Sequence, residues 1–159
     1  MERSVACVLP HLFPGWTSGE ENERSSGMEA WIQRHDCSAM PVQEPTFEQC
    51  LHLLRTHDWE KELSSYEHAL DEGRDRCPPA LQLTDGNRVL QLMPMRGDRT
   101  HYSYSCDHPL RILAFLGASR TFNAWNIGDE HRKSLVEMHF EGRQEELVEA
   151  LSCLTSQMG

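Results

Sequence analysis

The sequence predicts an α+β domain in which an antiparallel β-meander sheet packs against N-terminal helices and a C-terminal amphipathic helix. Three observations support this class. Apolar residues recur at helical spacing between residues 45 and 75, alternate with polar residues between 80 and 106, and return to helical spacing between 143 and 158. Helical and strand patterns that occupy separate blocks are typical of α+β domains. The length of 159 residues suits a single domain.

We expect residues 1–27 to form a flexible N-terminal extension and residues 28–159 to form the single α+β domain. Residues 17–27, TSGEENERSSG, are polar, contain glycine and serine, and show no apolar period. The apolar residues Leu9, Leu12, Phe13 and Trp16 lie before this stretch. They either dock on the domain or belong to a disordered tail, and both alternatives stay open.

Residues 45–59 carry the strongest helix signal in the first half of the chain. Thr46 is a suitable N-cap, and Gln49 three residues later completes a capping-box pattern. The apolar residues that follow lie at i, i+3, i+4 and i+7: Phe47, Cys50, Leu51 and Leu54. A second run at helical spacing consists of Trp59, Leu63, Tyr66 and Leu70. Gly73 and the prolines after it end this second helix.

The period then changes, and residues 80–93 predict a β-hairpin. Asp85-Gly86 is a favoured pair for a two-residue type I′ turn, and that loop places Leu83 opposite Arg88. Residues 94–106 supply a further turn and a third alternating strand. One face of these strands is apolar and the other is mostly polar, as a half-buried meander requires.

The C-terminal part of the chain gives four further expectations. Residues 109–117 fit either a buried strand or a short helix, and the proline and glycine that bound them favour the helix. Residues 120–127 and residues 136–140 alternate, which indicates strands. Residues 143–158 form a clear amphipathic helix. Its expected buried stripe consists of Leu147, Val148, Leu151 and Leu154.

Charge and hydropathy narrow the class of partner. The formal net charge of −10 disfavours nucleic acid and anionic membranes, because both attract clustered lysine and arginine. The longest apolar run, residues 112–118, is far shorter than the roughly 18 residues of a membrane span. The N-terminus lacks a convincing signal peptide, since Pro10 interrupts its short apolar stretch. We therefore expect a cytoplasmic protein whose six cysteines are thiols.

The acidity and the aromatic content of the chain favour a basic protein as its partner, in place of nucleic acid or a membrane. Residues 58–75 contain seven acidic side chains but only two basic ones, Lys61 and Arg74. Carboxylates steer a basic partner and aromatic side chains anchor it. The expected partner-binding residues are Asp58, Glu60, Glu62, Tyr66, Glu67, Asp71, Glu72, Tyr102, Tyr104 and Trp125. The competing interpretation is that the acidity only maintains solubility and that the aromatics border the core.

Two short stretches offer an alternative metal site. His35-Asp36-Cys37 and Cys106-Asp107-His108 hold the same residue types in mirror order, and together they would supply the Cys2His2 set that zinc accepts. Structural zinc sites usually separate paired ligands by two to four residues, whereas here one residue intervenes. Buried thiols and surface histidines are the preferred interpretation, so we expect no metal and no cofactor.

No motif in the sequence identifies a reaction. Cys106 lies in no recognisable nucleophile motif, and the adjacent Asp107 would raise its pKa. No glycine-rich phosphate loop and no H-E-x-x-H pattern occurs. Arg96-Gly97-Asp98 matches an adhesion tripeptide, but glycine and aspartate are also what a tight turn requires. We therefore expect a protein that is not an enzyme.

In size, acidity, α+β order and lack of a catalytic motif, the chain resembles immunity proteins of bacterial toxin systems. The resemblance implies a stoichiometric inhibitor that covers the active cleft of a toxin. Two alternatives stay open. One is a zinc-binding protein or a cysteine/histidine enzyme that uses His35, Cys37, Cys106 and His108. The other is a secretion chaperone, which should be a dimer that presents an apolar surface to its client.

Overall fold

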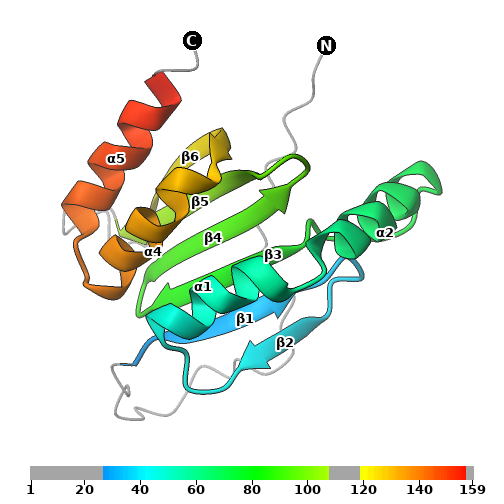
Figure 1. Ribbon diagram of the computed structural model, residues 1–159, viewed down its shortest axis with the longest axis horizontal. Coiled ribbons are helices and arrows are strands. Elements are labelled where there is room, and N and C mark those ends of the chain that lie inside the picture. The colour runs from blue at the N-terminus through cyan, green and yellow to red at the C-terminus, as the bar shows by residue number, and fades with distance from the viewer. Residues whose placement is uncertain (1–26, 108–118, 157–159) are drawn as a thin grey trace.

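The computed structural model describes residues 27–107 and 119–156, which form one antiparallel sheet with helices on one of its faces (Figure 1). In these residues the strands are β1 (Glu29–Gln33), β2 (Ala39–Val42), β3 (Ala80–Asp85), β4 (Arg88–Met95), β5 (Arg99–Asp107) and β6 (Ser119–Gly128). The helical segments are α1 (Phe47–Thr56), α2 (Trp59–Asp71), the 3-10 turn η1 (Asp129–His131), α4 (Arg132–Phe140) and α5 (Gln144–Ser156). The predicted α+β class is confirmed.

The sheet has the strand order β2-β1-β3-β4-β5-β6, and every neighbouring pair is antiparallel. Strands β3 to β6 form a meander, whereas the chain from β2 passes through α1 and α2 before it returns beside β1. The prediction that helices precede all strands is wrong, because β1 and β2 come first. These strands have only five and four residues, and Pro41 interrupts the second, so no alternating pattern is visible in the sequence.

The first meander hairpin is present, but its loop lies one residue further along than predicted. Asp85 pairs with Arg88, which leaves Gly86-Asn87 as the loop. Gly86 has a φ of 59°, and glycine with positive φ at the first loop position is typical of a type II′ turn. The physical reason for this register is burial, because it pairs leucine with leucine on the core face. The pairs are Leu81 with Leu92 and Leu83 with Leu90, all fully buried.

Predictions for the C-terminal half have mixed outcomes. The strand expected in residues 120–127 is β6, and the expected amphipathic helix is α5. Residues 136–140 are helical in α4, so the strand predicted there is wrong. The buried residues of α4 are Leu135, Val136 and His139, whose spacing suits a helix better than a strand. The segment expected at residues 109–117 lies outside the described residues.

The core lies between the helices and one face of the sheet. Helix α1 contributes Cys50, Leu51 and Leu54, and Thr46 caps it by accepting a hydrogen bond from the Gln49 backbone N–H at 3.2 Å, as predicted. Helix α5, which contacts β6, contributes the fully buried Leu147 and Leu151. Fully burying a leucine is worth about 1.5–3 kcal/mol, so each of these buried leucines contributes substantially to the stability of the described domain.

The opposite face of the sheet carries no described helix (Figure 1). One row across it consists of Trp31, Gln82, Gln91, Ser103 and Asn123, all uncharged. Near this row, the exposed Trp125 ring stacks on the His101 ring with 3.4 Å between centroids. Within residues 27–107 and 119–156, no helix has the length and apolar character needed to cross a membrane.

Candidate functional site

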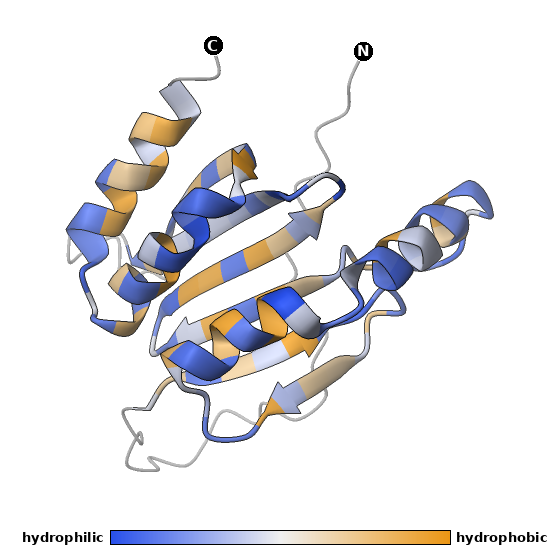
Figure 2. Cartoon of the chain, in the orientation of Figure 1, coloured by the Kyte–Doolittle hydropathy of each residue, from blue (hydrophilic) through white to orange (hydrophobic). Residues whose placement is uncertain are grey.

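Helix α2 presents most of the predicted acidic surface. Asp58 caps the helix by accepting a hydrogen bond from the Lys61 backbone N–H at 3.1 Å. One side of α2 buries Trp59, Glu62 and Ala69, and polar residues dominate the rest of the helix (Figure 2). We call the exposed carboxylates of this helix and its flanks the acidic α2 surface. It consists of Asp58, Glu60, Glu67, Asp71 and Glu72.

The structure does not bring the predicted partner-binding residues together on one surface. Glu62 is 6% exposed, and Tyr102 and Tyr104 are almost completely buried in the core. Burial raises the pKa of both tyrosines to about 12, which keeps their hydroxyls neutral. Their assignment to a contact surface is therefore wrong, because alternation identified their common face but not which face the helices cover. Tyr66 is half-buried on α2, and the exposed Trp125 lies on β6.

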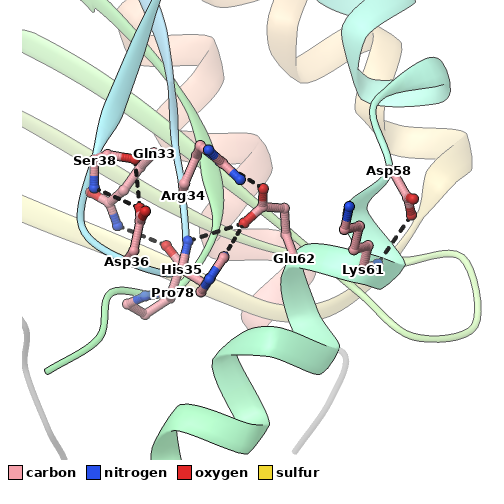
Figure 3. A network of polar contacts seen from close by, with 9 residues as sticks. All are labelled: Gln33, Arg34, His35, Asp36, Ser38, Asp58, Lys61, Glu62 and Pro78. Atoms are coloured by element: carbon pink, nitrogen blue, oxygen red, sulfur yellow. Dashed lines mark hydrogen bonds and ion pairs between the residues drawn. The ribbon is translucent and has the colours of Figure 1, made fainter. Parts of the chain in front are cut away.

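Glu62 instead holds the start of α2 against the turn between β1 and β2 (Figure 3). Its Oε1 accepts a hydrogen bond from Arg34 Nε at 2.9 Å. Its Oε2 accepts from the His35 backbone N–H at 3.2 Å and lies 2.6 Å from His35 Nδ1. Burial alone would raise the pKa of Glu62, but the hydrogen bonds from His35 and Arg34 outweigh it and hold the pKa at about 2. The carboxylate therefore stays charged and acts as a clamp.

A disulfide joins the same turn to the segment that follows α2. Cys37 in the β1–β2 turn is bonded to Cys77, with 4.9 Å between their Cα atoms. The Cys77 backbone N–H also donates a hydrogen bond to the His35 carbonyl oxygen at 3.0 Å. The expectation that all six cysteines are thiols is therefore wrong for this pair. The two cysteines are 40 positions apart in the sequence, and their spacing alone gave no sign of the bond.

The alternative metal site is not assembled by the residues that the structure describes. Cys37 is committed to the disulfide. Ile32 aligns through Leu81 and Leu92 with Tyr102, and β5 runs antiparallel to β1, so Cys106 lies toward the opposite end of the sheet from Cys37. His108 lies outside the described residues. In the described part of the chain, no cluster of three or more histidine, cysteine or acidic side chains is arranged to hold a metal. Burial also raises the pKa of the Cys106 thiol, which disfavours a nucleophilic thiolate.

A groove lies beside the acidic α2 surface, where the α1–α2 junction faces the β4–β5 turn and the start of α4. Its volume is about 590 Å³. We call it the helix-junction groove. Its lining residues are Leu54, Arg55, His57, Asp58, Trp59, Glu60, Leu63, Pro94, Met95, Arg96, Gly97, Asp98, Asp129 and Arg132. The Arg96-Gly97-Asp98 turn singled out in the sequence therefore forms part of one wall.

Several buried polar atoms of this groove have no hydrogen-bond partner among the described residues. They are Trp59 Nε1, His57 Nε2 and Arg132 Nε. The His57 and Trp59 rings pack edge to face with centroids 4.5 Å apart. Arg132 is anchored through Nη2, which donates to Thr100 Oγ1 at 3.0 Å and also contacts Asp129. Buried polar groups are nearly always paired in folded proteins, so this cluster distinguishes the groove from ordinary surface.

The rim of the groove continues the acidic α2 surface. The Glu60 side chain is 82% exposed, and its nearest cation is Arg96 at 3.7 Å. Arg96 makes its closer contact, 2.9 Å, with Glu67. Asp58 and Asp98 are exposed on either side. Sequence reasoning identified Asp58 and Glu60 but missed the groove itself, because its walls come from segments more than 30 residues apart.

Comparisons with protein-family models, with curated proteins and with solved structures return no match for this chain.

Proposed function

We propose that the chain is a non-enzymatic protein-binding module, most like an acidic immunity protein that neutralises a bacterial toxin by covering its active cleft. The acidic α2 surface is the proposed contact, and the partner is a basic protein. One observation carries the proposal. Five carboxylates are exposed on one short helix and its flanks, in a chain whose formal net charge is −10. Such a concentration of like charge speeds encounter with a basic surface.

The anchoring of α2 supports a role in binding. The clamp at Glu62 and the Cys37–Cys77 disulfide hold the two ends of the helical segment to the same β1–β2 turn. A surface on a rigid element loses little conformational freedom when it binds. Two cations partly neutralise the surface, since Arg96 contacts Glu67 and Arg74 contacts Glu72. Among the described residues the exposed Asp71 makes no ion pair, and Glu60, whose side chain is 82% exposed, makes only the longer contact with Arg96, so both carboxylates are available to a partner.

A binding titration tests the proposal. The purified chain is titrated with the basic protein encoded beside it, and stoichiometry and association rate are measured at low and high salt. Glu60→Gln is compared with Glu145→Gln, which removes the same charge from the exposed first turn of α5. We expect a one-to-one complex whose association slows with salt and with Glu60→Gln but not with Glu145→Gln. Absence of a complex, or equal effects of the two variants, would contradict the proposal.

A further inference from the structure

The face of the sheet opposite the helices has an uncharged centre. Residues paired across neighbouring strands share one face, because side chains alternate along each strand. On this face, the central row consists of Trp31, Gln82, Gln91, Ser103 and Asn123, and the row beside it runs from Thr84 through Val89 and Ser105 to Thr121. We call these two rows, together with the neighbouring pair Met93 and His101, the uncharged sheet face. On this side of the six described strands, charged residues occur only at the ends of β1 and β5: Glu29, Arg99 and Asp107.

Trp125 adds an exposed aromatic side chain to this face. Trp125 is 57% exposed, and its ring lies parallel to the His101 ring with an angle of 12° between the ring planes. Because the stack already holds the indole in place, a contact there costs little conformational freedom. Burial lowers the pKa of His101 to about 4, so that ring is neutral near pH 7. Aromatic side chains without nearby charge are typical of the centre of a protein interface.

The polar groups of the uncharged sheet face are suited to contact with copies of themselves. Gln82 and Gln91 lie at its centre, because β3 and β4 are the third and fourth strands of the sheet. Amide and hydroxyl groups both donate and accept hydrogen bonds. A two-fold axis brings the same patch of two subunits together, so each of these groups meets groups with which it can pair. Carboxylates in the same positions would repel each other.

The charge of the chain restricts where two copies can meet. Each copy has a formal net charge of −10, so contact through surfaces such as the acidic α2 surface is opposed by repulsion. The uncharged sheet face avoids close contact between carboxylates. Six strands spaced about 4.8 Å apart form a face about 29 Å wide, and about 17 Å along the strands gives about 500 Å² per copy. Two such faces bury about 1,000 Å², which is near the lower limit of specific interfaces.

We propose that the chain forms a two-fold symmetric homodimer in which the uncharged sheet faces of two copies pack against each other. Trp125 of each copy contacts the sheet of the other, and Gln82 and Gln91 lie near the axis. The helices lie on the other face of each sheet, so both acidic α2 surfaces stay free (Figure 1). The dimer does not depend on the proposed function, and it would allow one partner protein to bind to each copy.

The first test is sedimentation velocity of the full chain over a concentration series, at low and at high salt. We expect a reversible monomer–dimer equilibrium with a dissociation constant in the micromolar range. Salt should strengthen it, because screening reduces the repulsion between two acidic chains. The complex with a basic partner should respond to salt in the opposite way. A full chain that is monomeric at every concentration would overturn the inference and leave the face to a different occupant, and so would a dimer that salt dissociates.

The second test changes the charge at the centre of the face. Gln91→Glu places two carboxylates near the axis, so we expect dimerisation to weaken at least about tenfold. Gln49→Glu adds the same charge at an exposed position on α1 and is the matched control, with little expected effect.

Gln91→Lys should also be monomeric alone, but a mixture of Gln91→Glu and Gln91→Lys should form a mixed dimer. That recovery separates loss of the contact from loss of the fold. Equal behaviour of Gln91→Glu and Gln49→Glu, or a mixture that stays monomeric, would contradict the proposed face.

Discussion

Helices α2 and α5 are alike in length and in the acidic character of their first turns, but they are attached to the sheet in different ways. Each has 13 residues and an acidic first turn. Helix α5 is fixed by Leu147 and Leu151, which are fully buried. Helix α2 buries Trp59 and Ala69 but also a carboxylate, Glu62, whose attachment depends on charge. Two acidic amphipathic helices in one layer therefore differ in what releases them from the sheet. We expect α2 to respond to low pH and to reduction, and α5 to loss of apolar packing.

The largest expected effect comes from the disulfide at the α2 side. Replacing both Cys37 and Cys77 with serine frees a loop with a sequence separation of 40, which should lower the free energy of unfolding by about 4 kcal/mol on the chain-entropy model. Urea denaturation measures the loss. Hydrogen exchange of backbone amides should accelerate more in α2 than in α5, and equal acceleration in both helices would refute the contrast.

Truncation of the α5 stripe should cost slightly less. Leu151→Ala removes a fully buried side chain and leaves a cavity, so we expect a loss of about 3 kcal/mol in unfolding free energy. The neighbouring Cys153 is exposed, and Cys153→Ala is the matched control that should change stability little. If Leu151→Ala released α2 as readily as α5 in hydrogen exchange, the two attachments would not be independent.

The Glu62 clamp should make α2 sensitive to acid. Its pKa of about 2 lies below the usual 4.5, so the clamp stabilises the fold fully above pH 4.5 and is lost as the pH falls toward 2. At neutral pH, Glu62→Gln should reduce the unfolding free energy by about 2 kcal/mol, because hydrogen bonds to a charged group are lost. It should also flatten the pH dependence of stability below pH 4.5, and an unchanged slope would exclude the clamp.

A smaller effect is expected from His139 in α4, at a higher pH. Burial lowers the pKa of His139 from 6.5 to about 4, so the unfolded chain takes up a proton before the folded one does. The contribution of His139 alone to stability should therefore fall as the pH drops from 6.5 toward 4, by about 1 kcal/mol between pH 6.5 and 5.5. The His139→Gln variant should remove part of this slope, while leaving the acid transition of Glu62 in place. Burial also lowers the pKa of His101 to about 4, so His101 adds a contribution of similar size, which His139→Gln leaves in place.

Sequence periodicity was sufficient to predict a helix or strand where the element is long and the local signals agree. The capping pair Thr46 and Gln49 predicted the start of α1, and the leucine stripe predicted α5. It failed where elements are short, as in β1 and β2, or where five residues alternate inside a helix, as in α4. The loop of the β3–β4 hairpin was displaced by one residue because leucine pairing on the core face outweighs the intrinsic preference of Asp-Gly.

The candidate site was less predictable than the fold, because tertiary contacts create it. Acidic spacing identified Glu60 as exposed, but the same spacing included Glu62, which is buried by partners 27 and 28 residues away. Likewise, Trp59 looked like an ordinary helix residue, and only the approach of Arg132 from α4 makes it part of a groove. Periodicity identifies a face of an element, whereas the candidate site depends on which other elements pack against that face.

The crossover that carries the chain from β2 to β3 leaves β2 at one edge of the sheet, with consequences for self-association. An exposed edge strand is a template on which another chain can add a strand. Strand β2 has only four residues, and Pro41 lacks the backbone N–H that such an addition would need. Growth of the sheet into an intermolecular β-aggregate is therefore disfavoured at this edge.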